Sequence, residues 1–138
     1  LFVSGAYVAS DNWLSVNATK ADQKFVKEVL HVEWRADRAT QNGELKAVYA
    51  PNAQFSGDYQ FVQHLNEKIY AVESPDAIVP FGENAYTIMR YSQNNNSAAV
   101  AYSGEDYRVV VCGFPFETLE TEDMQERFMK QVIDFLTK

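Results

Sequence analysis

The spacing of apolar residues in the first third of the chain predicts one strand followed by helices. Residues 1–3 are apolar and precede a Ser-Gly pair, which is typical of a short buried strand that ends in a tight turn. The polar residues 10–12 can cap a short helix through residues 13–16. Between residues 22 and 34, apolar side chains recur every three or four positions, which indicates one face of a helix that Asp22 would cap.

From Gly43 onward the period changes to two, and this alternation predicts β-strands. Strands are expected at residues 45–49, 61–62, 69–72, 77–80, 85–91, 97–102 and 107–114. Short polar segments at residues 93–96 and 103–106 separate the last three strands. Because such short separators favour hairpins, these three strands are expected to form an antiparallel meander.

The chain ends in a predicted amphipathic helix that starts near Thr121. Its apolar stripe consists of Met124, Phe128, Val132, Phe135 and Leu136. The mixture of helices and strands predicts an α/β fold with a mixed sheet. A chain of 138 residues is expected to form a single domain, spanning residues 1–138.

Composition narrows the classes of function. Twelve Lys and Arg against 19 Asp and Glu give a net charge of −7, which argues against a nucleic-acid partner. No apolar run reaches the roughly 18 residues of a membrane span, so no membrane insertion is expected. Cys112 lies in an apolar run and is expected in the core, and His31 and His64 stand alone, so neither a metal nor a cofactor is expected. Asp76 stands beside a proline and is expected to bond its own turn backbone.

Two segments, one near each end of the chain, carry a resemblance to a known family. Residues 2–11 read FVSGAYVASD and residues 113–118 read GFPFET. Together they resemble the second half of a class I glutamine-amidotransferase-like domain, which implies a flavodoxin-like, mainly parallel sheet flanked by helices and truncated at its start. By this resemblance Tyr7 stands where the family has its catalytic Cys and Pro115 where it has His, and only Glu117 matches. The resemblance therefore implies the scaffold without amide hydrolysis.

Residues 70–76 and 98–100 extend the resemblance to a domain of large secreted Bacteroides-type proteins described as xanthan lyases. This resemblance implies a secreted or periplasmic location, in a larger protein with other domains that is linked to polysaccharide or the cell envelope. It also implies that residues 1–138 are the C-terminal part of a domain cut from a longer chain. A sheet edge exposed in this way would allow a homodimer.

Tyr7, Ser10, Asp11 and Glu117 are the candidate ligand-binding residues. The loops after the first strand and after Phe114 are expected side by side at the C-terminal ends of parallel strands, where open α/β sheets bind ligands. Carboxylate and hydroxyl groups with a stacking Tyr7 would suit a carbohydrate or peptide ligand. In the alternative, Tyr7 packs in the core, Asp11 caps a helix and Glu117 accepts backbone N–H groups of the preceding turn.

The leading hypothesis is a non-catalytic domain that acts in binding or architecture, with no catalytic residue assigned. The alternative is a carbohydrate-active enzyme, either a polysaccharide lyase that uses Tyr7 as a base or a glycoside hydrolase that uses the Asp11 and Glu117 carboxylates. A third hypothesis is an interaction module without a small ligand.

Overall fold

The computed structural model describes residues 1–14 and 16–138. Its helices are α1 (Val8–Asp11), α2 (Lys20–Glu28), the 3-10 helix η1 (Phe116–Thr118) and α3 (Glu122–Leu136). Its strands are β1 (Phe2–Ser4), β2 (Val32–Ala36), β3 (Glu44–Ala47), β4 (Asp58–Gln60), β5 (Ala77–Pro80), β6 (Ala85–Tyr91), β7 (Ser97–Ser103) and β8 (Arg108–Cys112). Of the predicted short helix at 13–16, residue 15 lies outside the described residues, and the helix found in this region is α1.

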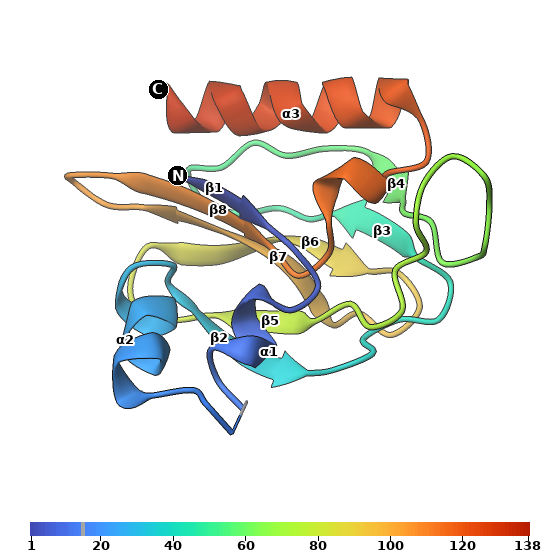
Figure 1. Ribbon diagram of the computed structural model, residues 1–138. Helices are drawn as coiled ribbons and strands as arrows, with labels where there is room; N and C mark the ends of the chain where they lie inside the picture. Colours follow the sequence, from blue (N-terminus) through green and yellow to red (C-terminus); the bar gives the residue numbers. More distant parts are fainter. Residues whose placement is uncertain (15) are drawn as a thin grey trace.

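The main sheet is mixed but mostly antiparallel. It has six strands in the order β1-β8-β7-β6-β3-β4. β1 and β8 run parallel, and the other neighbouring pairs run antiparallel. A second sheet pairs β2 with β5, also antiparallel. The expected α/β architecture, a mainly parallel, flavodoxin-like or amidotransferase-like sheet flanked by helices, is therefore wrong, and the protein is mainly β (Figure 1).

Short connections explain this strand order. Residues 92–96 join β6 to β7, and residues 104–107 join β7 to β8. A parallel crossover needs about a dozen residues or more, so these neighbours can only run antiparallel. β1 and β8 are separated by nearly the whole chain, and they are free to pair in parallel.

Helix α2 is shorter than the helix predicted over 22–34. Thr19, rather than Asp22, is the N-cap residue, and the two form a capping box. The Asp22 amide donates to Thr19 Oγ1 at 3.2 Å, and the Thr19 amide donates to the Asp22 carboxylate at 2.7 Å. His31 has a φ of 57°, in the left-handed region that a helix cannot continue through, and β2 follows directly.

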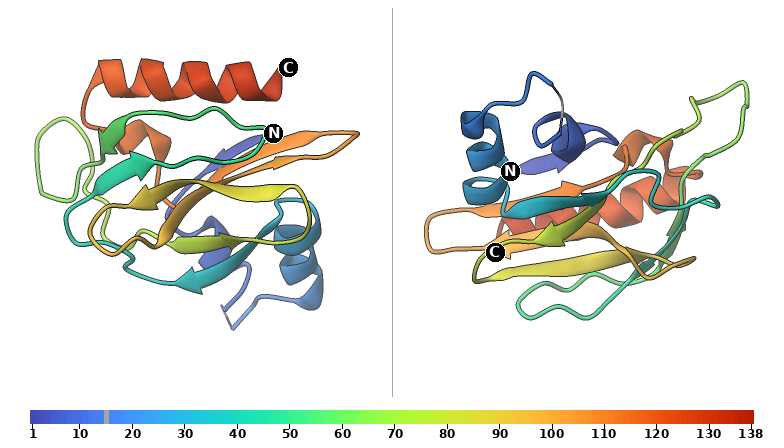
Figure 2. Two further views of the ribbon diagram at one scale, coloured as in Figure 1. Left: turned by 180° about the vertical axis from the view of Figure 1, so that it is seen from behind. Right: turned by 90° about the horizontal axis from the view of Figure 1, so that it is seen from below.

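Different layers cover the two faces of the main sheet (Figures 1 and 2). Helix α3 lies across one face, and the β2–β5 sheet with α1 and α2 lies on the other. Strand β8 contributes to both cores by alternation: Val110 and Cys112 belong to the cluster that contains Phe128 of α3, and Val109 and Val111 belong to the cluster that contains residues of α2 and β5. The sheet is thus buried on both sides at its centre.

Helix α3 packs through the predicted apolar stripe. Phe128, Val132 and Phe135 are buried, and Met124 and Leu136 are partly buried at its margins. This packing fixes the position of η1, which connects the end of β8 to the start of α3. Within the described residues, no helix has both the length and the apolar character that crossing a membrane requires.

Candidate functional site

The C-terminal ends of β1 and β8 lie side by side and bring two distant loops together. Ser4 pairs with Cys112 in the parallel ladder, and the Gly5 amide donates to the Cys112 carbonyl at 3.2 Å. The amide of Phe116 in η1 donates to Ser4 Oγ at 3.2 Å. The loop after β1 and the loop after β8 therefore leave the sheet from one edge and are tied to each other.

A cleft of about 450 Å³ opens between these loops. It is lined by Ser4, Gly5, Ala6, Tyr7, Val8, Asp11, Asn12, Tyr70, Pro115 and Glu117. Three of the four residues proposed from the sequence, Tyr7, Asp11 and Glu117, thus share one cleft. Ser10 does not line it: its side-chain oxygen is buried, and its backbone amide donates to the Asp76 carboxylate. A ligand-binding role for the three remains a prediction.

Tyr70 is a cleft residue that the sequence pattern does not indicate. The expected strand at 69–72 is wrong, because this segment forms a loop. The Tyr70 hydroxyl donates to Glu117 Oε1 at 2.7 Å and so fixes that carboxylate. The pKa of Tyr70 is raised to about 12. Partial burial is the largest cause, and the hydrogen bond to Glu117 and the negative charge of Glu117 add to it. Tyr70 therefore keeps its proton, and it acts as a hydrogen-bond donor at ordinary pH.

The two cleft tyrosines expose their rings. Tyr7 is 49% exposed and Tyr70 is 54% exposed, so neither ring is a core side chain. Tyr7 occupies the N-cap position of α1 without a side-chain capping bond, and Asp11 is the last residue of that helix rather than its cap. Glu117 bonds to the Tyr70 hydroxyl. The alternative in which Tyr7 packs and Asp11 caps is not what the structure contains.

Asp76 supports the wall of the cleft from below. Its side chain accepts from the Ser10 amide at 3.1 Å and from the Trp34 indole at 3.3 Å, and its backbone carbonyl accepts from the Tyr91 hydroxyl at 2.6 Å. Burial raises the pKa of Asp76 to about 6, and nearby Asp37 adds to the shift, whereas the bonds from Ser10 and Trp34 oppose it. The sequence predicted that Asp76 bonds the backbone of its own turn. It did not predict these contacts, because each partner lies far away in sequence.

Gly113 allows the loop after β8 to pass close to Asp76. Its amide donates to the Ala98 carbonyl at 2.8 Å, and its carbonyl accepts from the Asp76 amide at 2.8 Å. A Cβ atom at this position would overlap the Asp76 carbonyl oxygen. The close backbone approach that places Pro115 and Glu117 in the cleft therefore requires glycine.

The described residues that line the cleft include neither Cys nor His. Cys112 is buried within the sheet, and burial raises the pKa of its thiol far above the ordinary value. No group of three or more His, Cys, Asp or Glu side chains in the described part of the chain is arranged to hold a metal ion. His31 pairs with the Tyr107 hydroxyl at 2.7 Å, and neither it nor His64 lines the cleft. The polar groups that remain, carboxylates, phenols and the Asn12 amide, are suited to hydrogen bonding of hydroxyl groups.

Comparisons with known proteins give the fold but no family. No known family and no curated protein matches the chain. Among solved structures, the cold-adapted β-galactosidase from Rahnella sp. R3 matches over 79% of this chain with a TM-score of 0.53 and 12% sequence identity. The match spans 15% of the β-galactosidase.

The resemblance to a class I glutamine-amidotransferase-like domain of Bacteroides-type proteins described as xanthan lyases is therefore wrong. Its flavodoxin-like sheet would be mainly parallel, whereas among the described strands of the main sheet β1 and β8 are parallel and the other neighbouring pairs are antiparallel. Short segments such as residues 2–11 describe a strand, a turn and a helix, a sequence of elements that many folds share. The chain shares its fold with one segment of a β-galactosidase.

Proposed function

We propose that this chain is a non-catalytic domain that binds a neutral oligosaccharide in the cleft between the β1 and β8 loops. The proposal rests on one arrangement: two exposed tyrosine rings, Tyr7 and Tyr70, at a cleft in which Tyr70 holds the Glu117 carboxylate. Aromatic faces pack against the apolar faces of sugar rings, and oriented carboxylates accept hydrogen bonds from sugar hydroxyls.

Charge favours neutral over acidic sugars. Asp11 and Glu117 are both in the cleft wall, and none of the described residues that line it is Lys or Arg. A uronate would meet like charges without a cation to neutralise it. The absence of a cation among these residues also argues against lyase chemistry, which needs one beside the uronate carboxylate.

The surroundings of the two carboxyl groups support binding over hydrolysis. A catalytic acid is kept protonated by an enclosed apolar setting. Asp11 and Glu117 are both exposed, and one oxygen of Glu117 is already bonded to Tyr70. The structural neighbour carries the name of a carbohydrate-acting enzyme, a β-galactosidase, which fits a carbohydrate-related role in a larger protein. A secreted or periplasmic location would suit that role.

An oligosaccharide array, followed by calorimetric titration of the sugars that bind, tests the proposal. Tyr7→Ala and Tyr70→Ala should each weaken binding about tenfold or more, because each removes a stacking surface. Tyr49→Ala is the matched control, since Tyr49 is 91% exposed and does not line the cleft. Binding that survives both cleft substitutions, or peptide binding in place of sugar binding, would overturn the proposal.

Catalysis is tested separately on the sugars that bind. Release of new reducing ends or of unsaturated products should stay at the blank level. Turnover that Glu117→Gln or Asp11→Asn abolishes would show that the cleft is an active site and would replace the binding hypothesis by the enzymatic one.

A further inference from the structure

Among the described strands, none pairs with the outer edge of β1. The Leu1 carbonyl accepts from the Val110 amide at 2.9 Å, and the Gly5 amide donates to the Cys112 carbonyl at 3.2 Å. Alternate residues of a strand direct their N–H and C=O groups to the same side, so these two residues and Val3 face β8. Phe2 and Ser4 therefore direct their amides and carbonyls outward, because β1 is the terminal strand of the sheet.

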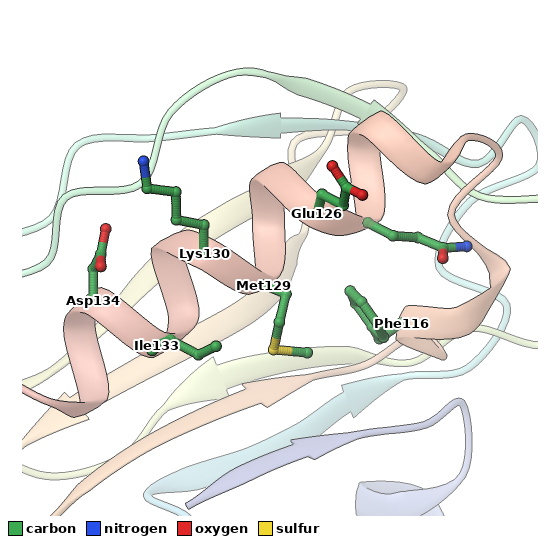
Figure 3. A pocket seen from close by; sticks show the side chains of 7 residues that line it. Phe116, Glu126, Met129, Lys130, Ile133 and Asp134 are labelled. Carbon is green, nitrogen blue, oxygen red and sulfur yellow. The ribbon is translucent and has the colours of Figure 1, made fainter.

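An apolar groove of about 510 Å³ lies beside this edge, on the side of α3. Figure 3 shows Met129 and Ile133 projecting from one side of α3, with the Phe116 ring of η1 beside Met129. Ile133 is 52% exposed. The Phe116 ring lines the groove and packs edge-on against Phe2 of β1, with ring centroids 5.9 Å apart. The outward edge of β1 and the groove residues Phe116, Met129 and Ile133 are here named the β1–α3 surface.

We propose that the β1–α3 surface is the interface of a homodimer formed by two copies of this chain about a two-fold axis. An axis midway between the Val3 residues of the two copies places Phe2 of each copy opposite Ser4 of the other in an antiparallel pair. Opposed residues of this type exchange both of their backbone hydrogen bonds, so the outward groups of both residues are satisfied in both copies. The two main sheets become one continuous sheet.

The charges along α3 are compatible with a second copy. Glu126, Lys130 and Asp134 follow at one-turn intervals along the groove, so the sign of charge alternates. A two-fold axis that sets two such helices antiparallel can bring Lys130 of each copy to an acidic residue of the other. The chain as a whole is acidic, with a net charge of −7, and this alternation reduces the repulsion that two acidic faces would otherwise meet.

Burial of the groove supplies the attraction. Exposed apolar side chains next to an unpaired strand edge are a combination that soluble proteins cover by pairing. Met129 and Ile133 from the two copies would face each other across the axis, above the joined strands. The edge then sets the register, and the apolar side chains supply most of the affinity.

Sedimentation analysis of the 138-residue chain over a wide concentration range tests the proposal. A dimer is expected, and Ile133→Lys and Met129→Lys should each weaken it about tenfold or more, because each places a charge in the apolar contact. Leu65→Lys is the matched control, since Leu65 is 95% exposed and does not line the groove. Circular dichroism of each variant confirms that the fold is retained.

Amide hydrogen exchange at Ser4 tests the strand pairing itself. The Ser4 amide should become protected from exchange as the dimer forms. The amide of Tyr107, at the tip of the β7–β8 hairpin, is the reference, and its exchange rate should not change. A monomer at all concentrations, or a dimer that both lysine variants leave unchanged, overturns the proposal. A dimer in which the Ser4 amide stays unprotected refutes the antiparallel β1 pairing.

Discussion

The Asp76 carboxylate accepts a hydrogen bond from the Ser10 amide at 3.1 Å, across 66 positions of sequence. Ser10 lies in α1, whose N-cap residue Tyr7 makes no side-chain capping bond. Asp76, the residue directly before β5, therefore supplies the capping acceptor that the helix itself lacks. The wall of the cleft that carries Tyr7 and Asp11 is in this way held by a buried acid.

Asp76 should make the stability of the protein depend on pH. Its pKa is raised to about 6 in the folded protein, so the folded state holds the proton more tightly than the unfolded chain does. The stability that this proton contributes is present below the unfolded pKa and is lost as pH rises through the folded pKa. Relative to Asp76→Asn, the wild-type chain should lose about 2 kcal/mol of unfolding free energy between pH 4 and pH 7.

Urea unfolding of the two proteins at a series of pH values measures this difference. Asp106→Asn is the control, since it removes one carboxyl group from an exposed turn. The difference between wild type and Asp76→Asn should follow a single titration step, and the control should lack that step. If the difference in unfolding free energy does not change with pH, the buried carboxyl group is not protonated near pH 6.

Gly113→Ala should destabilise the fold and disturb the cleft. The new Cβ atom would overlap the backbone carbonyl of Asp76, which cannot rotate away. A loss of about 1–3 kcal/mol in unfolding free energy is expected. Gly104→Ala is the comparison, because its Cβ meets only the end of the Tyr102 side chain. Equal losses in the two variants would argue against a tight backbone approach at Gly113.

Phe128→Ala should cost the most of any single truncation on α3. Phe128 is fully buried, with the rings of Tyr59 and Phe55 at centroid distances of 5.7 and 6.0 Å. Loss of this ring removes apolar burial and leaves a cavity, so a decrease of about 3–5 kcal/mol in unfolding free energy is expected. Tyr49→Ala, at an exposed position, should change stability by about 0.5 kcal/mol or less. A small effect at Phe128 would mean that α3 does not pack on the sheet as described.

The Cys112 thiol should not react in the folded protein. It is fully buried, and burial raises the pKa of the thiol, so the reactive thiolate is rare and inaccessible. Alkylation by iodoacetamide, followed by mass spectrometry, should be negligible in native buffer and complete in guanidinium chloride. Equal rates in the two conditions would contradict the buried position of β8.

Residue patterns determine the elements that local rules control. The apolar stripe of the C-terminal helix needs only a period of 3.6, and its members Phe128, Val132 and Phe135 are buried. The grouping of Tyr7, Asp11 and Glu117 in one cleft follows from a single pairing, β1 with β8, whose strands both end at the same edge. For the helix the information lies within a few residues, whereas the β1–β8 pairing joins residues from opposite ends of the chain.

The tertiary structure alone decides which strands are neighbours and which distant side chains meet. An alternating pattern is the same in parallel and antiparallel sheets, so it does not give strand direction. The short separators correctly predicted the antiparallel pairs β6–β7 and β7–β8, whereas the mainly parallel sheet implied by the resemblance is wrong. Tyr70 reaches Glu117 across 47 positions, and Asp76 reaches Ser10 across 66, each from a loop or strand end without a local signal. The sequence by itself determined local periodicity and charge, because these act over one turn or one strand. The contacts that shape the cleft arose only when the whole chain packed.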